Sequence, residues 1–374
     1  TRMVNKRRIS KVEKVKLMDL HPNPSRLFGL PKTHKVNCPM RPIVSYIGSS
    51  AYKMSKHLSR LLKNYTERKP SSLKNSIDFK RKLEEININK NTILLSGDIE
   101  SLYTNIPVEE TKAIIGKILS EDQDLTSKTN LKIEDILEMT GISLSCNSFL
   151  FNDKYYKQIE GLPMGSPLSP VLAEIYMEHY EDNIMSRTRL QPKAFFRYVD
   201  DTFIIWEHGT EEVKPYFEEL NEKTKSIKWT FEMESQCELP FLDTIVKRKN
   251  DQISIGIYRK NTNVGKYLNY KSAHPSQVKK GIVTSFLNRA KLLTKGDEWK
   301  KEVKTIVKIL RENDYPANII TEAINKIESD KKKEATKDTP ENRIILPYIG
   351  PTSLKIAKVL KKSISPQYSN QGNH

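Results

Sequence analysis

The sequence predicts an α+β protein in which short strands alternate with helices in the first two-thirds of the chain and helices dominate the remainder. Runs rich in β-branched and aromatic residues, separated by turn residues, recur as far as Arg259. From Ser276 onward the apolar residues recur at helical spacing instead. A chain of 374 residues is also too long for one small core, so we expect two or three subdomains.

The composition indicates a polyanionic partner. The formal net charge is +17 and the pI is near 9.4, which favours nucleic acid, although lysine also serves simple solubility. A membrane is not expected, because the sequence has no apolar run approaching ~20 residues and no signal-peptide pattern. The cysteines, Cys38, Cys146 and Cys237, lie too far apart to indicate a zinc knuckle or a disulfide framework, which fits a reducing intracellular compartment.

Basic residues are prominent near the N-terminus. Residues 1–24 are predicted to form a basic arm. Three interpretations of this arm are open: it contacts a nucleic-acid backbone, it connects to an upstream domain, or it is a solvated tail. Residues 25–46 contain two short apolar segments joined by a polar turn, which predicts a hairpin presenting Lys32 and Arg41, with a helix following at about 50–65. Cations on such a hairpin suit phosphate recognition, but each alone also fits a solvated surface charge.

Asp98 lies where a buried strand is predicted to end. The apolar run at 93–95 predicts that strand, and Pro107 suits the first position of a helix whose first turn contains Glu109 and Glu110. An acid at the end of a central strand is well placed to reach a cleft. A role as a helix cap or turn residue fits this stretch equally well.

A loop rich in glycine and proline follows at 161–170. The stretch before it is predicted to form helices, an exposed polar loop at 121–130 and a hairpin around Asn152. The glycines of the 161–170 loop allow its backbone to approach a ligand closely, and Ser169 is expected to start a helix over 171–180. By itself this loop also fits an ordinary strand-to-helix connection.

The apolar run at 195–206 has two adjacent carboxylates, Asp200 and Asp201, at its middle. It predicts two short strands with the acidic pair at the turn. Aspartate is a common turn residue, so a plain turn is one explanation. Two Mg²⁺ ions are the other, because hard cations take carboxylate oxygens, and a pair about 3.5–4 Å apart can bind the attacking and leaving oxygens of a phosphoryl transfer. That explanation requires a further carboxylate, and Asp98 supplies it.

The chain after this run is predicted to form one helix and three strands. In order they fall at 217–225, 228–233, 241–246 and 253–259. Three helices follow at 276–294, 297–312 and 316–328, with basic polar faces. A charged linker at 329–343 and a short helix at 352–361 close the chain.

The first of the three late helices is a candidate for binding a nucleic-acid backbone. Its candidate contacts are Lys279, Lys280, Arg289 and Lys291. A basic helical face of this kind suits the phosphates of a duplex. A plain solvated face fits any single lysine about as well.

In this order the segments resemble the fingers, palm and thumb of a reverse transcriptase. The YVDD at 198–201 resembles the catalytic hairpin of that family, and the strand ending in Asp98 resembles its other metal-binding motif. GLPMGSPLSPVLAEIYME at 161–178 resembles the template-and-nucleotide-positioning loop and helix, and LPFLD at 239–243 resembles the primer grip. The resemblance covers roughly residues 25–330 and implies a right-hand polymerase fold.

The resemblance also divides the chain into parts. After the basic arm at 1–24, it implies fingers at 25–91 and 108–160, a palm of antiparallel sheet plus helices at 92–107 and 161–250, a helical thumb at 251–328, and a charged linker and C-terminal segment at 329–374.

Within the family, the sequence motifs most resemble those of Penelope-like retroelements, whose polymerases are related to telomerase reverse transcriptase. The matching stretches are FGLPKTHK (28–35), MRPIVS (40–45), GDIESLYTNIP (97–107), FRYVDD (196–201), and the run from GIYRKN (256–261) through YKSAHPS (270–276). A telomerase-type reverse transcriptase is one alternative. A catalytically inactive polymerase-fold protein that binds nucleic acid is another, and it predicts the loss of an acidic residue, whereas all three aspartates are present.

The resemblance implies roles for particular residues of the catalytic site. It makes Asp98, Asp200 and Asp201 the catalytic carboxylates and, with the backbone carbonyl of Ile99, the ligands of two Mg²⁺ ions, or of Mn²⁺ in their place. Asp98 and Asp200 are implied as the principal ligands, with Asp201 in support.

Nucleotide contacts are implied for four further residues. Lys32 and Arg41 would contact the triphosphate, and Gly165 would shape the template-side pocket. Tyr103 would stack under the sugar, where an aromatic ring clashes with a ribose 2′-OH and so selects deoxynucleotides.

The same resemblance implies which residues hold the primer and which partners the protein binds. The primer end would be held by Phe241, Leu242 and Asp243, and the helix from Ser276 would track the duplex backbone. The implied partners are template RNA, a DNA primer or target DNA, and dNTPs, and the implied process is target-primed reverse transcription in the nucleus.

Two tripeptides invite a different interpretation. Members of this family often have a GIY-YIG endonuclease after the polymerase, and Gly256-Ile257-Tyr258 and Tyr348-Ile349-Gly350 are both present. They stand much farther apart than that nuclease allows, so we interpret both as coincidence. Either the element lacks this nuclease or the nuclease follows the end of this sequence.

Overall fold

The computed structural model describes residues 2–31, 37–66, 69–249, 251–329, 343–360 and 365–369. Contacts within the chain divide it into two compact units. The first unit comprises Thr1–Leu242 with Val246–Ser254, and the second comprises Asp243–Ile245 with Ile255–His374. In the described part of the chain, no helix combines the length and apolarity needed to cross a bilayer. The subdomain limits expected from the resemblance stay predictions.

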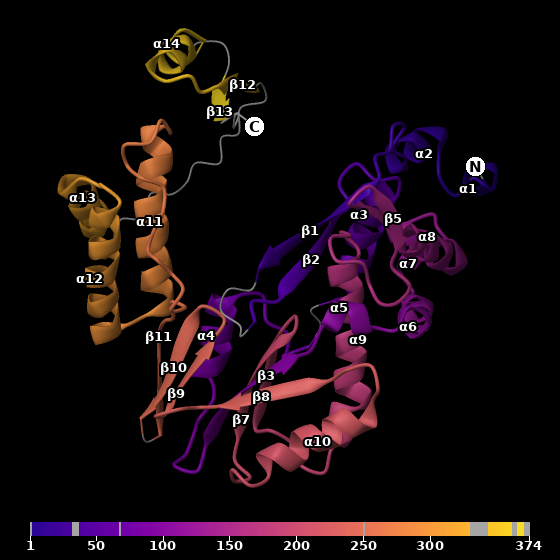
Figure 1. The fold of residues 1–374 in the computed structure, drawn as a ribbon, viewed down its shortest axis with the longest axis horizontal. Coiled ribbons are helices and arrows are strands. Elements are labelled where there is room, and N and C mark those ends of the chain that lie inside the picture. Colours follow the sequence, from indigo (N-terminus) through magenta and orange to yellow (C-terminus); the bar gives the residue numbers. More distant parts are fainter. Residues whose placement is uncertain are drawn as a thin grey trace. The chain divides into compact units, whose positions relative to one another are not determined.

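A four-stranded antiparallel sheet lies at the centre of the first unit, with strand order β6-β7-β3-β8 (Figure 1). Its strands are β3 (Ile93–Ile99), β6 (Ala194–Tyr198), β7 (Asp201–Trp206) and β8 (Trp229–Met233). β6 and β7 form the hairpin predicted around the acidic pair. β3 is the strand predicted to lead to Asp98, and β8 is the strand predicted at 228–233, so all three predictions are confirmed.

The two faces of this sheet are buried against different elements. One face, which includes Ile204 and Trp206, packs in one core with helices α9 and α10, and Figure 1 shows both helices beside the sheet. The other face includes Phe203, whose ring contacts the rings of Phe79 in α4 and Phe241 in β9. The bounds of these elements are α4 Ser76–Glu84, α9 Ser169–Asn183, α10 Val213–Lys223 and β9 Glu238–Phe241.

Strand pairing assigns the charged residues of the hairpin to different faces. Side chains alternate between the faces along a strand, and residues paired across two strands share a face. Asp98 pairs with Asp201, and Arg197 pairs with Thr202. The two aspartates therefore share the aromatic face with Phe203, whereas Arg197 lies on the face that α9 covers.

A second sheet in the first unit has the order β2-β1-β4-β5. Its strands are β1 (Ser25–Pro31), β2 (Met40–Ser45), β4 (Ser148–Phe151) and β5 (Lys154–Lys157). β1 and β2 form the predicted N-terminal hairpin, and β4 and β5 form the hairpin predicted around Asn152. Val44 and Tyr46 are buried in a small core with Leu27 and Phe149, which joins the two hairpins.

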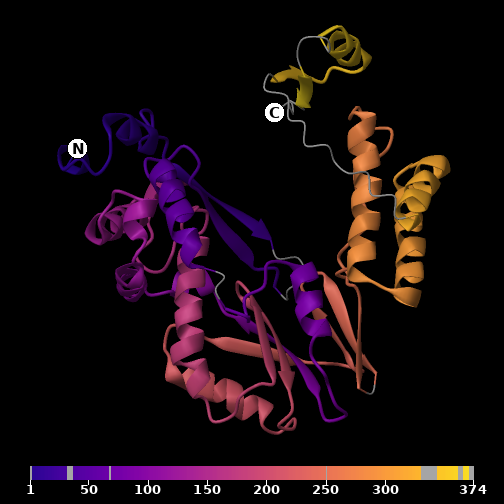
Figure 2. The same cartoon turned by 180° about the vertical axis from the view of Figure 1, so that it is seen from behind.

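The remaining helices of the first unit lie around these sheets (Figure 2). They are α1 (Arg2–Asn5), α2 (Lys11–Leu17), α3 (Tyr52–Leu62), α5 (Leu102–Asn105), α6 (Val108–Glu121), α7 (Leu125–Lys128) and α8 (Ile133–Ser145). α3, with a 3₁₀ turn at Lys63–Tyr65, is the helix predicted at 50–65. The short α7 lies inside the stretch predicted as a polar loop.

Ser169 begins α9, as predicted, with Leu168 as its cap. The structure corrects two other element boundaries. Pro107 caps α6 rather than beginning it. The strand predicted over 241–246 is interrupted, because Leu242 has a φ of +53° and turns the chain between β9 and β10 (Thr244–Lys249).

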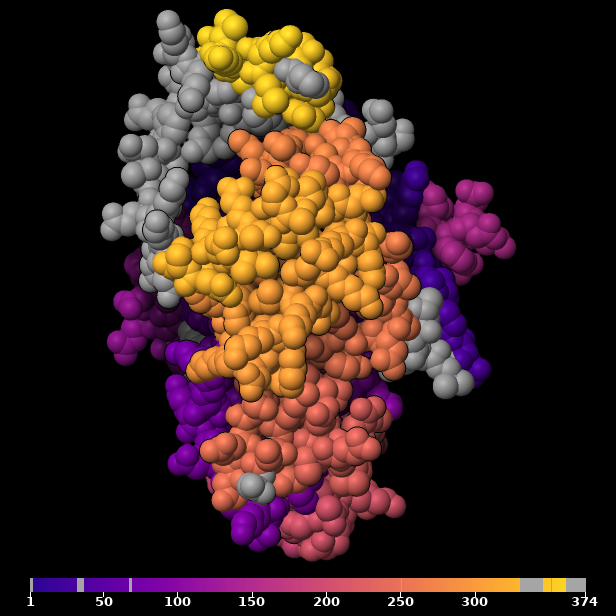
Figure 3. Space-filling model, turned by 90° about the vertical axis from the view of Figure 1, so that its left-hand side faces the viewer, coloured from indigo at the N-terminus to yellow at the C-terminus, as the bar shows by residue number. Residues whose placement is uncertain are grey.

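Helices dominate the second unit, as predicted. α11 (Ser276–Leu293), α12 (Gly296–Glu312) and α13 (Ala317–Glu328) match the three predicted segments closely. Leu287, Ile306, Leu310 and Ile320 are buried where these helices meet. Figure 3 shows the surface of α12 and α13 in orange and amber.

Shorter elements flank these helices. β11 (Gln252–Ile257) pairs with β10 in a three-stranded sheet of order β11-β10-β9. Near the C-terminus, β12 (Arg343–Pro347) pairs in parallel with β13 (Ser365–Ser369), and α14 (Pro351–Leu360) between them is the helix predicted at 352–361. Most of the predicted charged linker lies outside the described residues.

Candidate active site

Three aspartates occupy neighbouring backbone positions at one end of the central sheet. Asp98, near the end of β3, pairs with Asp201 at the start of β7. Asp200 occupies the turn between β6 and β7, and its carbonyl oxygen accepts a hydrogen bond from the N–H of Ile99 at 3.1 Å. Asp98 and Asp200 are half-buried and Asp201 is exposed. The fold therefore brings together all four residues for which a catalytic or metal-binding role was predicted.

The turn that contains Asp200 has an uncommon backbone conformation. Val199 has a φ of +59°, in the left-handed region that a β-branched residue rarely adopts. The bond between Ile99 and Asp200 and the pairing of Tyr198 with Asp201 close the turn on both sides. Such a conformation persists only where the surrounding contacts define it, so the place of Asp200 depends on those contacts.

The donor set at this end of the sheet suits a hard divalent cation. Neighbouring carboxylates repel each other when ionised, and a cation between them relieves that repulsion. In the ranges that the structure describes, no three Asp, Glu, His or Cys side chains are already gathered as a metal cage. Mg²⁺ is usually held by one or two carboxylates together with substrate phosphates rather than by an all-protein cage. The aspartates present therefore fit a site that is completed by a bound nucleotide.

Tyr103 lies beside the acidic turn. It belongs to α5 and is half-buried. Burial is the main cause that raises the pKa of its phenol, and the negative charges of Asp200 and Glu174 add to it. Its carbonyl oxygen also accepts a hydrogen bond from the N–H of Leu162 at 2.6 Å. Tyr103 is thus held between the acidic turn and the glycine-rich loop, and its role under a sugar stays a prediction.

Two glycines let the glycine-rich loop approach other backbone closely. Gly165 has a φ of +109°, and a Cβ at this position would collide with the carbonyl oxygen of Val44 in β2. Gly161 has a φ of +71°, and a Cβ there would collide with the carbonyl oxygen of Thr104 in α5. The loop is therefore wedged between β2 and α5, and a side chain at either glycine would force these elements apart.

One of the two cations predicted at the triphosphate can be placed. Arg41 is exposed on β2, where it pairs with Leu30 of β1. It lies on the same strand as Val44, which the glycine-rich loop contacts. Lys32 lies outside the described residues, so its place in the site stays a prediction.

The segment predicted to hold the primer end forms the end of β9 and the turn after it. In the first unit, Phe241 is 4% exposed and packs against Phe79. In the second unit, Asp243 forms an ion pair with Arg289 of α11. The roles predicted for these residues in binding a primer or a backbone stay predictions.

Several cations of α11 already have partners within the protein. The ammonium of Lys279 donates a hydrogen bond to the carbonyl of Ser272 at 2.7 Å. The ammonium of Lys291 donates to a carbonyl of α13 at 2.7 Å. Together with the pairing of Arg289, three of the four predicted backbone contacts are engaged internally. Lys280 is exposed.

Sequence reasoning did not anticipate a buried ion-pair cluster behind the acidic turn. Arg197 in β6 is 1% exposed and pairs with Glu174 and Glu181 of α9. Burial opposes its positive charge, but the two glutamates outweigh burial and raise the pKa of Arg197. A signal was present, because a charged residue interrupts an aromatic strand and the two glutamates stand seven residues apart, on one face of a helix.

A basic pocket of about 580 Å³ lies at the N-terminal arm, between α2, α3 and the loop around α7. The cations that line it are Arg8, Lys16, Lys53, Lys56, Arg60 and Lys128. Burial lowers the pKa of His57, which also lines the pocket. Three of these cations have counter-charges, because Lys53 lies 3.6 Å from Asp19, Arg8 lies 3.6 Å from Asp135 and Lys128 lies 2.7 Å from Asp122. Glu13 also lines the pocket. The other cations, Lys16, Lys56 and Arg60, suit phosphate groups.

Known proteins are similar to this chain in sequence and in structure. A model of the family "Reverse transcriptase (RNA-dependent DNA polymerase)" matches residues 30–236, and a model of the "Animal helix-turn-helix domain" matches residues 266–325. No curated protein sequence matches the chain. Among solved structures, telomerase from Candida albicans with the TWJ fragment of telomeric RNA has a TM-score of 0.57 and 13% identity, covering 86% of this chain and 58% of the telomerase chain.

A second telomerase gives a similar result. Telomerase from Candida tropicalis with the TWJ fragment of telomeric RNA has a TM-score of 0.50 and 14% identity, covering 88% of this chain and 58% of that chain. At such low identity the likeness concerns the fold, and it confirms the predicted polymerase fold of strands and helices. This chain spans under two-thirds of both telomerase chains.

Proposed function

This chain belongs to the reverse transcriptase family of RNA-dependent DNA polymerases, whose model matches more than half of it, and on that premise we propose that it is the polymerase of a Penelope-like retroelement. It extends the 3′-OH of a DNA primer on an RNA template with dNTPs. The observation that best supports catalysis is that Asp98, Asp200 and Asp201 occupy neighbouring backbone positions at one end of the central sheet.

The aspartates hold divalent cations, as is general in this family. Asp98 and Asp200 are the principal ligands, with Asp201 and the Ile99 carbonyl in support, and carboxylate oxygens suit Mg²⁺, or Mn²⁺ in its place. When bound, the cations supply positive charge at the transferred phosphoryl group and at the attacking and leaving oxygens. The protein's own contribution is to fix these oxygens in place before the substrate arrives.

Side chains around the aspartates select and orient the nucleotide. Arg41, with Lys32, binds the triphosphate through charge and hydrogen bonds. Tyr103 lies under the sugar, and its ring excludes a ribose 2′-OH. The ring has little freedom to retreat, because Tyr103 is half-buried and its backbone is tied to Leu162. The expected substrate is therefore a deoxynucleoside triphosphate.

Nucleic acid is bound through the positive charge of the chain. The net charge of +17 and the basic pocket at the N-terminal arm support an RNA partner. Binding should weaken steeply with salt, with a log–log slope of about 0.7–0.9 for each phosphate contact. The helix-turn-helix match at 266–325 supports contact with target DNA.

The sequence motifs favour a Penelope-like element over a telomerase. The stretches at 28–35, 97–107 and 256–276 support this choice. The likeness to telomerase structures supports the fold alone. We expect target-primed reverse transcription in the nucleus, with a 3′-OH of the target DNA as the primer.

Primer extension with matched substrates tests this function. The assay compares an RNA with a DNA template of the same sequence, dNTPs with rNTPs, and a nicked duplex with a single-stranded telomeric primer. We expect extension with dNTPs on RNA, started at the nick. Extension with rNTPs alone would contradict a reverse transcriptase, and repeat addition to the telomeric primer in preference to the nick would contradict the retroelement assignment.

A further inference from the structure

The buried cluster around Arg197 touches the acidic turn directly. One guanidinium nitrogen, Nη1, donates to Glu174 Oε2 at 2.8 Å, and the other, Nη2, donates to Glu174 Oε1 at 3.1 Å. Nε bonds to Glu181, and Nη1 also donates to the carbonyl oxygen of Val199 at 3.3 Å. A two-point pairing with a carboxylate fixes the plane of the guanidinium. The contact with Val199 is therefore directed, because the planar group cannot turn away.

Val199 is the residue whose conformation needs support. Its φ of +59° is unfavourable for a β-branched side chain, and the next residue is Asp200. If Val199 relaxed to a more usual conformation, the backbone at Asp200 would rotate with it. The hydrogen bond from Arg197 holds the carbonyl of Val199 in the orientation that the left-handed turn requires.

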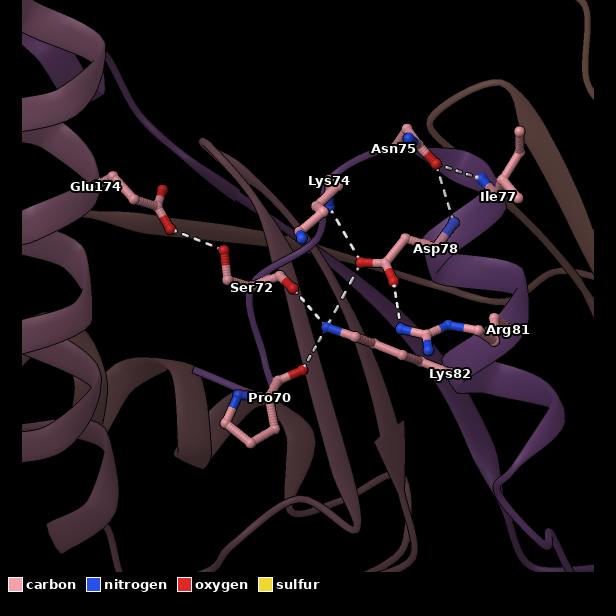
Figure 4. Close-up of polar contacts among 9 residues, drawn as sticks. All are labelled: Pro70, Ser72, Lys74, Asn75, Ile77, Asp78, Arg81, Lys82 and Glu174. Carbon is pink, nitrogen blue, oxygen red and sulfur yellow. Dashed lines mark hydrogen bonds and ion pairs between the residues drawn. The ribbon is translucent and has the colours of Figure 1, made fainter. Parts of the chain in front are cut away.

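A third segment completes the cluster from the other side. Ser72 Oγ donates to Glu174 Oε1 at 2.9 Å (Figure 4), and Ser71 Oγ donates to Glu181 Oε2 at 2.7 Å. The backbone of Arg197 is bonded to the same segment, because its N–H donates to the carbonyl of Ser71 at 2.8 Å and its carbonyl accepts from Leu73 at 2.9 Å. Each glutamate thus has an arginine on one side and a serine hydroxyl on the other.

This segment is itself fastened to α4. The ammonium of Lys82 donates to the carbonyls of Pro70 at 2.7 Å and Ser72 at 2.5 Å (Figure 4). Asp78 accepts a hydrogen bond from the N–H of Lys74 at 3.2 Å and lies 3.6 Å from Lys82. α4, the segment before it, β6 and α9 are therefore joined through one set of polar contacts, with Arg197 at its centre.

We propose that Arg197 is a positioning residue: it holds the left-handed turn at Val199 and thereby sets the place of Asp200 relative to Asp98. The inference rests on the proposed polymerase function, since it assigns a means of positioning to that same site. Only a planar group with five donors can serve two glutamates and a carbonyl together, so lysine is not an equivalent. Arg197 does not contact substrate, because it is buried.

The test compares Glu174→Gln and Arg197→Lys with a matched control, Glu234→Gln. Glu234 has a side chain that is 8% exposed and pairs with Arg248 at 2.7 Å, so the control makes the same change in a similar ion pair. We expect kcat to fall about 10- to 100-fold in both test variants, because small misplacements at a reacting centre have effects of this size. The KM for dNTP should change less than about threefold, and the control should match the wild type.

A second readout does not depend on turnover. Binding of Mn²⁺ in the presence of a dNTP, followed by electron paramagnetic resonance of the free ion, should weaken several-fold in Glu174→Gln and stay unchanged in Glu234→Gln. If the wild type extends no primer, the proposed function fails, and the Mn²⁺ titration still decides the positioning role. Equal Mn²⁺ binding in Glu174→Gln and wild type would overturn the inference.

A rescue experiment separates positioning from general loss of stability. Glycine adopts the left-handed conformation without support, so Val199→Gly added to Glu174→Gln should restore part of the lost kcat while the melting temperature stays low. A double variant no more active than Glu174→Gln alone, with kcat falling in proportion to the folded fraction, would show that the cluster serves folding only. If Arg197→Lys does not fold, the Glu174→Gln series gives the decision.

Discussion

The glutamates behind the β6–β7 hairpin and the aspartates at its tip are both groups of like charge, yet the protein surrounds them differently. Glu174 and Glu181 share a fully buried guanidinium and two serine hydroxyls. Asp98 and Asp200 are half-buried, and Asp201 is exposed. The first group has its cation built into the fold, whereas the second is accessible to cations that come with a substrate.

This difference distinguishes acids that stabilise the fold from acids that take part in the reaction. A buried acid paired with a buried base cannot lose its partner without a large loss of stability. Acids that repel each other at an accessible site lower stability, and their presence there indicates a functional role. Exchanging a carboxylate for an amide should therefore reduce stability in the glutamate group, with activity falling only through the displacement of Asp200, whereas in the aspartate group it should reduce activity directly.

The largest effect is expected at Asp98. Asp98→Asn keeps the shape of the side chain but removes its charge, so the rate of primer extension should fall about 10³-fold, the scale at which lost electrostatic stabilisation of a transition state acts. Single-turnover extension on RNA measures this, and circular dichroism should show an unchanged fold. Extension at more than a tenth of the wild-type rate would show that Asp98, like the glutamates, stabilises the fold and is not required for the reaction.

A smaller effect is expected at Tyr103, which lies next to both groups. Tyr103→Val removes the ring under the sugar, so incorporation of rNTPs relative to dNTPs should rise about 10- to 100-fold, in the range expected for a change in pocket shape. Tyr103→Phe is the control, because it keeps the ring and should keep the selectivity. Competition assays with paired dNTP and rNTP measure the ratio. An increase of the same size in Tyr103→Phe would point to the hydroxyl instead.

Substitution of Gly165 should act through stability. Gly165→Ala places a Cβ against the carbonyl of Val44 at a φ of +109°, which should destabilise the first unit by about 1–3 kcal/mol. Gly281→Ala is the matched control: Gly281 lies within α11 and has nothing within 4 Å of its Cβ position, so alanine there should stabilise by roughly 0.5–1 kcal/mol. Urea denaturation measures both. Equal signs would contradict the wedged position of the loop.

The smallest effect is expected at the basic pocket. Lys56→Glu and Arg60→Glu should each lower the slope of log affinity for single-stranded RNA against log salt by about 0.7, if each contacts one phosphate. Lys214→Glu on α10, where the lysine side chain is 76% exposed, is the control and should leave the slope unchanged. Fluorescence anisotropy across a salt series measures the slopes. Three equal slopes would show that charge acts without a defined site.

The sequence predicted most elements because their signals are local. The strands of the acidic hairpin and the three late helices follow from alternation and helical spacing within short windows. The position of Asp98 beside the acidic hairpin could be predicted from chemistry, because binding two cations requires a further carboxylate. The left-handed turn at Leu242 had no such signal, and it interrupted a strand that was predicted as continuous.

The remaining misses depend on contacts between distant segments. Arg197 is paired with a helix and with a segment after α3, and neither partner lies near it in the sequence. The cations of α11 seemed equivalent by charge, yet Lys279 and Lys291 are bonded within the protein and Lys280 is exposed. A sequence gives the number of charged residues, but packing decides which of them can contact a ligand.

One paired measurement tests the central contrast most directly: primer extension and thermal unfolding of Asp200→Asn and Glu181→Gln. For Asp200→Asn we expect extension about 10²- to 10³-fold below wild type, with a melting temperature unchanged or raised because a like charge is removed. Glu181→Gln should lower the melting temperature by several degrees, because it removes one of the two counter-charges of buried Arg197, and should retain measurable extension. Full extension by a folded Asp200→Asn variant would show that Asp200 takes no part in catalysis.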